Sequence, residues 1–157
     1  SGLLVAAKHP HAQEVLKNQL HTADFRRGYL AVCEGVPFPR EGTVDAPLGP
    51  KADSLVEQEV RPDGKPARTH YQVVKDNGTR TLLRLVLDTG RTHQIRVHMA
   101  HLGHPLTGDF LYGTERRDLI SRPALHSAEL SFRHPLTGQT LSFSLPLPED
   151  MAALINF

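Results

Sequence analysis

The densest group of chemically capable side chains lies in the segment LDTGRTHQIRVHMAHLGHP, residues 87–105. It holds two arginines, four histidines and an aspartate, namely Arg91, Arg96, His93, His98, His101, His104 and Asp88. Histidines serve as acid–base catalysts and metal ligands, and arginines hold carboxylates or phosphates through paired hydrogen bonds. Three interpretations are open: a metal site, an acid–base site, or half of an active site that another segment completes.

A helix is predicted within this segment. Ile95, Met99 and Leu102 fall at i, i+4 and i+7, which is one face of a helix. Thr92 is expected to cap the first turn, and Gly103 stands where a left-handed residue ends a helix. The directions of the polar side chains around the helix axis can therefore be predicted from helical geometry.

This geometry argues against a metal site. His98 and His101 are close on a helix, but His93 lies about 140° from His98. Zinc needs three or four converging ligands, and the sequence has no H-E-x-x-H pattern. We predict that no metal binds and that the histidines hydrogen-bond to backbone or phosphate. A metallohydrolase built on His98 and His101 is kept as an alternative.

Arg96 is predicted at the border of the core, about 100° from Ile95 and beside the small Ala100. A guanidinium there suits a carboxylate or a phosphate as its partner. A structural pairing that ties the helix to a sheet fits the helix equally well.

Other catalytic patterns are missing from the sequence. It contains no G-x-S-x-G elbow, no phosphate-binding G-x-x-x-x-G-K-[ST] loop and no G-x-G-x-x-G at the start of a helix. Cys33, the one cysteine, stands in an apolar run and is predicted to be a buried structural thiol. One cysteine excludes an internal disulfide and favours a reducing, cytoplasmic location.

Length and charge narrow the function further. The chain has 157 residues, and we expect residues 1–157 to form a single domain. The formal net charge is only +1, so contact with nucleic acid would depend on a local cleft. Its apolar runs are far shorter than the roughly 20 residues that span a bilayer, so no membrane contact is expected.

The hydrophobic patterns predict an α+β fold with a mixed, mainly antiparallel sheet and two or three flanking helices. Asn77-Gly78, between two strand-like runs, is typical of a type I′ hairpin turn. The predicted elements are strands over 3–7 and 28–35, a helix over 9–21 with Pro10 in its first turn, a long excursion with short edge strands over 36–66, and hairpins over 69–88 and 128–145.

Five segments, in order, resemble the RluA-type RNA pseudouridine synthases. The most specific is TGRTHQIRVHMAHLGHPLTGDFLYG, residues 89–113. The others are SGLLVAAK, FRRGYLAVCEG, DGKPARTHYQVV and RPALHSAELSFRHPLTGQ. The resemblance implies an isomerase without metal or organic cofactor that detaches a flipped uridine base from its ribose and rejoins it through carbon. Its RNA partner would be structured ribosomal or transfer RNA.

The resemblance also implies a role for each matching residue. Tyr29 would stack on the target base and assist proton removal from carbon, and Arg96 would pair with a catalytic aspartate. Leu125 would pack against the base. The other predicted substrate-binding residues are Arg91, Thr92, His93, Gln94 and His126.

The catalytic loop of that family reads H-R-L-D-x-x-T-S-G, and its serine corresponds to Ser1. Its aspartate would therefore precede this sequence. Asp24, Asp88 and Asp109 occupy positions that do not replace it. We expect a catalytic domain that is incomplete at its N-terminal side and inactive by itself, because Arg96 lacks its carboxylate. The alternative is a catalytically silent RNA-binding module of the same fold.

Overall fold

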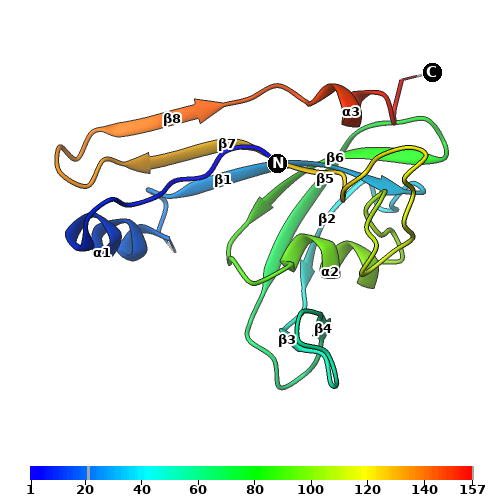
Figure 1. Cartoon of the computed structure of the whole chain (residues 1–157), viewed down its shortest axis with the longest axis horizontal. Helices are drawn as coiled ribbons and strands as arrows, with labels where there is room; N and C mark the ends of the chain where they lie inside the picture. Colours follow the sequence, from blue (N-terminus) through cyan, green and yellow to red (C-terminus); the bar gives the residue numbers. More distant parts are fainter. Residues whose placement is uncertain (21, 157) are drawn as a thin grey trace.

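Six antiparallel strands form the central sheet of the computed structural model, which describes residues 1–20 and 22–156. Their order across the sheet is β2-β5-β6-β1-β7-β8 (Figure 1). The strands are β1 (Arg26–Glu34), β2 (Glu41–Asp45), β5 (Arg68–Asp76), β6 (Arg80–Leu87), β7 (Leu125–Arg133) and β8 (Thr140–Ser144). The mainly antiparallel α+β fold is confirmed.

Short elements surround this sheet. A two-stranded hairpin, β3 (Leu48–Pro50) and β4 (Gln58–Val60), projects away from it, as Figure 1 shows. The helices are α1 (Pro10–Gln19), α2 (Gln94–His101) and α3 (Glu149–Ala152). No helix in the described part of the chain is both long and apolar enough to cross a membrane.

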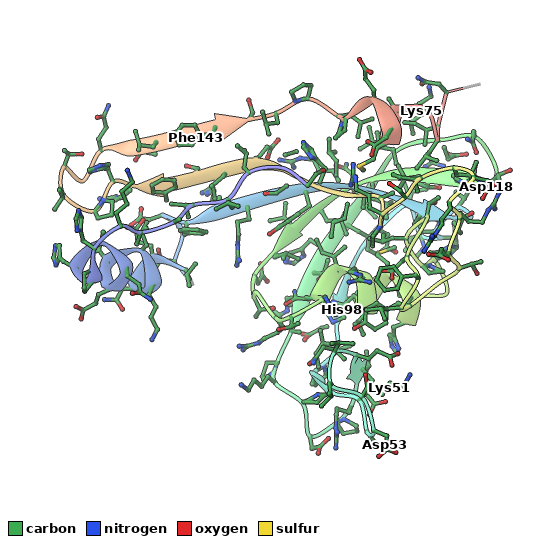
Figure 2. All side chains as sticks on the ribbon, in the orientation of Figure 1. Lys51, Asp53, Lys75, His98, Asp118 and Phe143 are labelled. Atoms are coloured by element: carbon green, nitrogen blue, oxygen red, sulfur yellow. The ribbon has the colours of Figure 1, made fainter. Side chains whose placement is uncertain are left out.

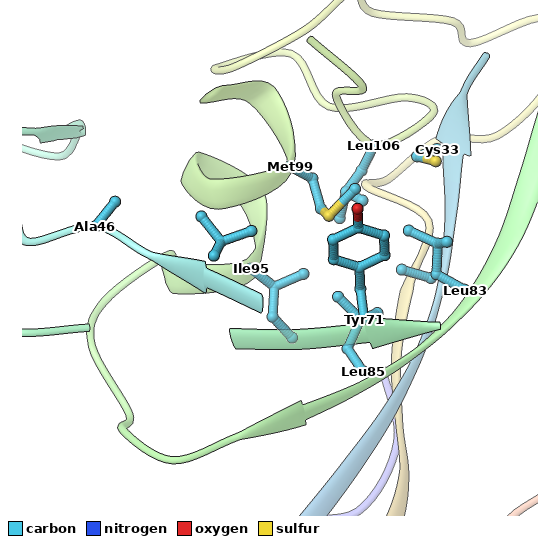
Figure 3. Packing of buried hydrophobic residues seen from close by; sticks show 10 residues of the cluster. Cys33, Ala46, Tyr71, Leu83, Leu85, Ile95, Met99 and Leu106 are labelled. Carbon is cyan, nitrogen blue, oxygen red and sulfur yellow. The ribbon is translucent and has the colours of Figure 1, made fainter. Parts of the chain in front are cut away.

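The two faces of the sheet carry different cores because side chains alternate along each strand. Ala31, Leu83 and Leu85 are fully buried on one face. Ile95 and Met99 of α2 pack against this face, as Figure 3 shows for Leu83 and Leu85. Val32 and Leu82 point to the other face, where they pack against α3. The helix that bears the arginine–histidine segment is thus seated on the centre of the sheet.

The hairpin around Asn77-Gly78 is confirmed, but its predicted turn type is wrong. A type I′ turn needs positive φ at both central residues, whereas only Gly78 has it, at 81°. The Asn77 carboxamide oxygen instead accepts hydrogen bonds from the backbone N–H groups of Thr79 and Arg80. This side-chain bracing, which asparagine makes readily, replaces the two-residue turn.

The predicted strand over residues 3–7 is wrong. Only Gly2 forms a bridge, to Ser127 in parallel orientation, and Leu4 is 81% exposed. The edge of β7 beyond this point is already paired with β8, so no backbone is free to continue the ladder. The apolar run packs by its side chains instead, with Leu3 and Val5 against the cluster that holds α1 to β7.

The remaining predicted elements agree closely with the structure. Helix α1 begins at Pro10 as expected, although the predicted end at His21 lies outside the described residues. The excursion over 36–66 holds only the short strands β2, β3 and β4. The second hairpin is formed by β7 and β8, as predicted.

Cys33 is fully buried on β1, as predicted. Burial, reinforced by the neighbouring Glu34, raises the pKa of its thiol to about 12 from an ordinary 9.0. At pH 8 the thiolate fraction should therefore fall on the order of a thousandfold. We expect a thiol reagent to label the native chain far more slowly than the chain in denaturant. Equal labelling rates in the two conditions would contradict this burial.

Candidate active site

Tyr29 and Leu125 come together on the face of the sheet that α2 covers. Ser127 of β7 is the register partner of Tyr29, and Leu125 is the partner of Ala31. Residues two apart in a strand share a face, so Tyr29 and Leu125 are diagonal neighbours. Both are half-buried and pack against the cluster that contains Ile95. The Tyr29 hydroxyl makes no hydrogen bond to the described residues, so it is left available to a ligand.

The first residues of the chain are held beside these two side chains. The amino group of Ser1 donates to the Leu125 carbonyl at 3.1 Å, and the Leu3 N–H donates to the Ser127 carbonyl at 2.9 Å. Gly2, between them, has φ 107°, and a Cβ there would lie 2.6 Å from the Ser127 nitrogen. Only glycine allows this close crossing.

Arg96 already has a carboxylate partner, which corrects the expectation that it lacks one. Its Nε and Nη2 each donate to Asp109 at 2.7 Å in a bidentate pair. The Asp109 side chain is fully buried and that of Arg96 is 12% exposed. This hydrogen bonding raises the pKa of Arg96, so the guanidinium stays charged. Its Nη1 forms no hydrogen bond to the described residues.

Asp109 also organises the loop that follows it. Its Oδ1 accepts hydrogen bonds from the backbone N–H groups of Leu111 and Tyr112, at 3.0 and 3.2 Å. Phe110 and Tyr112 then flank the arginine, with ring centroids 5.8 and 5.0 Å from its guanidinium carbon. The pair therefore has a structural role, as one interpretation of Arg96 predicted, but it joins α2 to this loop and not to the sheet.

Helix α2 starts at a different residue from the one predicted. The N-cap is His93, in a left-handed conformation at φ 56°, and Thr92 precedes it. The end is as expected, with Gly103 at φ 83°. The His93 Nδ1 lies 2.8 Å from the Tyr112 hydroxyl. Burial, with the nearby Arg96, lowers the pKa of His93 and favours its neutral form.

Gln94 is 2% exposed, and its carboxamide is saturated within the chain. The oxygen accepts from the Thr89 hydroxyl and the Arg91 N–H, and the nitrogen donates to the Arg68 carbonyl and the Thr69 hydroxyl. A carboxamide has no further capacity. We therefore propose a structural role for Gln94 in place of the predicted RNA contact.

His126 is likewise buried, at 4% exposure. Its Nδ1 lies 3.0 Å from the Ser1 hydroxyl, and its Nε2 is buried without a hydrogen-bond partner in the described structure. Burial lowers the pKa of His126. In this conformation the side chain braces Ser1, and we propose that bracing role instead of a direct substrate contact.

Arg91 and Thr92 line an open groove of about 550 Å³ between the β3–β4 hairpin and the start of α2. Lys65 and Gly90 also line this groove, and the Arg91 Nε donates to the Pro66 carbonyl. A third cation, Arg61, is neutralised there by a bidentate pair with Asp63. The groove thus retains the basic groups of Lys65, which is exposed, and of Arg91, which is half-buried. A larger groove of about 800 Å³ over β1, β6, β7 and β8 contains none of the predicted site residues.

The histidines are spread among separate structural contacts. His98 is fully buried beneath the sheet, where it contacts the Thr69 hydroxyl and the Ala46 carbonyl (Figure 2). His104 contacts the Glu34 carbonyl. No three His, Cys, Asp or Glu side chains among the described residues are grouped closely enough to hold a metal ion.

The two other aspartates considered as catalysts are engaged elsewhere. Asp88 lies 2.9 Å from the His70 ring and 3.8 Å from Arg68. Asp24 pairs with Arg133 at 2.9 Å. Both carboxylates are exposed, and neither contacts Tyr29 or Arg96.

Comparison with known proteins gives consistent results. A family model described as RNA pseudouridylate synthase matches residues 1–101. An uncharacterized RNA pseudouridine synthase of Bacillus subtilis, YjbO, is 50% identical over 99% of this chain and 55% of its own length. The ribosomal large subunit pseudouridine synthase D of Nitrosomonas europaea is 45% identical over 99% of this chain and 47% of its own length.

A solved structure shares the fold. Human RNA pseudouridylate synthase domain containing 1 superposes with a TM-score of 0.73 and 26% identity, over 87% of this chain and 58% of the human one. This chain therefore spans about half the length of the relatives that it matches.

Proposed function

The chain belongs to the RluA-type family of RNA pseudouridine synthases, and we propose that it supplies the base-holding part of an active site that isomerises uridines in structured RNA. The observation that carries this proposal is the meeting of Tyr29 and Leu125 on one sheet face, beside Ser1. An aromatic ring and an aliphatic side chain form a platform for an unstacked base. The exposed Lys65 and the half-buried Arg91 provide charge for the phosphate backbone.

We propose further that the nucleophilic aspartate comes from sequence that this chain does not cover. Asp24, Asp88 and Asp109 each have another cationic or histidine partner. Arg96 is held by Asp109 through two of its nitrogens, and its Nη1 is left for a second carboxylate. A cation at that point would keep a catalytic carboxylate ionised inside a cleft.

Large-subunit ribosomal RNA is the substrate class that we favour. The Nitrosomonas europaea relative carries that substrate in its name. Transfer RNA is the other candidate. RNA of both kinds is found in the cytoplasm, which we propose as the location.

A hybrid enzyme tests this function. In it, this chain replaces the matching segment of the Nitrosomonas europaea relative, so the residue before Ser1 is attached beside Leu125. We expect the hybrid to release tritium from large-subunit RNA labelled at uridine carbon 5, and the isolated 157-residue chain to release none.

Two outcomes would contradict the proposal. Tritium release by the isolated chain would show that its own carboxylates suffice. A hybrid that binds the RNA without releasing tritium, while the unaltered relative is active, would favour the silent RNA-binding module.

A further inference from the structure

The contacts around His93 leave one consistent arrangement of protons. The Tyr112 hydroxyl accepts a hydrogen bond from the Gln58 backbone N–H at 2.9 Å, and it lies 2.8 Å from the His93 Nδ1. If the histidine donated here, the hydroxyl would accept twice and its own proton would have no acceptor among the described residues. The Tyr112 hydroxyl is therefore the donor in its hydrogen bond with the His93 Nδ1.

We propose that Tyr112 is a positioning residue, whose hydroxyl donates to Nδ1 of His93 and so fixes the neutral ring with its proton on Nε2, ready to donate to an oxygen of bound RNA. This inference rests on the proposed function for its RNA partner only. The arrangement of protons in the free chain stands independently of it.

The surroundings of Tyr112 suit this role because they immobilise its ring. Its edge meets the His93 ring at 73° with the centroids 5.5 Å apart, and the Arg96 guanidinium lies over its face. The buried Asp109 accepts from its backbone N–H. Strand β4 supplies the Gln58 N–H, which donates to the Tyr112 hydroxyl. Three separate elements therefore fix where the hydroxyl points.

The backbone of His93 gives a second, independent reason. A left-handed conformation is strained in a residue other than glycine, and such residues cluster at functional sites. Helix α2 uses no side-chain cap at this position. In this conformation the His93 ring meets Tyr112, whereas a standard N-cap residue has an extended backbone and uses its side chain to accept a backbone N–H of the first turn.

The charges that face the ring also favour its neutral form. Burial and the Arg96 cation lower the pKa of His93, and Asp109 opposes them more weakly. The Tyr112 hydroxyl stays protonated because burial raises its pKa, although Arg96 acts the other way. An uncharged donor next to Arg96 can contact a carbonyl or phosphate oxygen without adding a second buried cation.

Nitrogen-15 correlation spectra of the histidine rings in the 157-residue chain test the proton arrangement directly. At neutral pH we expect His93, assigned by its loss in His93→Gly, to show an unprotonated Nδ1 and a protonated Nε2. In Tyr112→Phe the ratio of the Nε2–H to the Nδ1–H form should fall roughly fivefold, as expected for the loss of one hydrogen bond. Tyr71→Phe, which removes a hydroxyl bonded to the Pro39 carbonyl, is the control and should change nothing.

Binding of a uridine-containing stem–loop RNA tests the consequence. Tyr112→Phe should weaken binding roughly fivefold in the natural background, and not at all in the His93→Gly background, where glycine also relieves the left-handed strain. A protonated Nδ1 in the natural chain, an unchanged ratio in Tyr112→Phe, or an equal loss of binding in both backgrounds would overturn the proposal. Absence of RNA binding by the natural chain would contradict the proposed function, and the ring spectra would then decide the role of Tyr112.

Discussion

Replacing Asp109 with alanine should lower the free energy of unfolding by about 3–5 kcal/mol, the range for removing one partner of a buried ion pair. The Arg96 guanidinium would remain at 12% side-chain exposure with no counter-charge. The N–H groups of Leu111 and Tyr112 would also lose their acceptor. Urea unfolding followed by circular dichroism measures the change.

A matched control separates burial from ion pairing as such. Asp118 also holds an arginine through two hydrogen bonds, those of Arg116, but this pair is exposed. Exposed pairs contribute little to stability. Asp118→Ala should therefore leave the unfolding midpoint almost unchanged. A midpoint as low as that of Asp109→Ala would contradict the argument from burial.

A double variant tests whether the lone charge is the cause. Buried ion pairs can often be replaced by apolar residues without loss of stability, whereas removal of one partner leaves an unpaired buried charge that destabilises the fold. Arg96→Met with Asp109→Leu should thus recover the part of the lost stability that the unpaired charge causes, while the part due to the N–H groups of Leu111 and Tyr112 stays lost. If the double variant were as unstable as the sum of its single changes, the two side chains would be acting independently.

The sequence predicted those elements whose signals are local. Neighbouring residues in the sequence determine three of these elements, namely the hairpin over 128–145, helix α1 and the end of α2 at Gly103. Each error has a physical cause. Thr92 has the right chemistry for a cap, but His93 adopts the left-handed conformation and takes the N-cap position. Residues 3–7 have the composition of a strand but no free edge to pair with.

The site was harder to predict because its contacts are long-range. Arg96 and Asp109 are separated by the end of α2 and a loop, and no periodicity relates positions in a loop to those on a helix. From the sequence, Asp109 is only a rejected replacement for the nucleophile, and Tyr112 has no predicted role. Gln94 and His126 were expected at the RNA surface, whereas both are buried. The sequence signal that could have indicated this contact is the segment GDFLYG, whose acidic and aromatic residues follow the helix closely.

Tyr29 is the residue whose replacement should have the largest effect on catalysis. In the hybrid enzyme, Tyr29→Phe should slow tritium release about 10²–10⁴-fold, the usual contribution of a positioned acid–base group. The ring remains, so stacking on the base and the affinity for RNA should change little. The loss is expected in kcat rather than KM.

The structure makes this substitution a clean test. The Tyr29 hydroxyl has no hydrogen-bond partner among the described residues, so its removal leaves no buried polar group unpaired. Tyr71→Phe serves again as the control, because Tyr71 lies on the same face of the sheet but its hydroxyl is bonded to the Pro39 carbonyl. We expect the Tyr71→Phe hybrid to keep its rate. If the Tyr29→Phe hybrid also kept its rate, the hydroxyl would have no part in proton transfer, and Tyr29 would act through its ring alone.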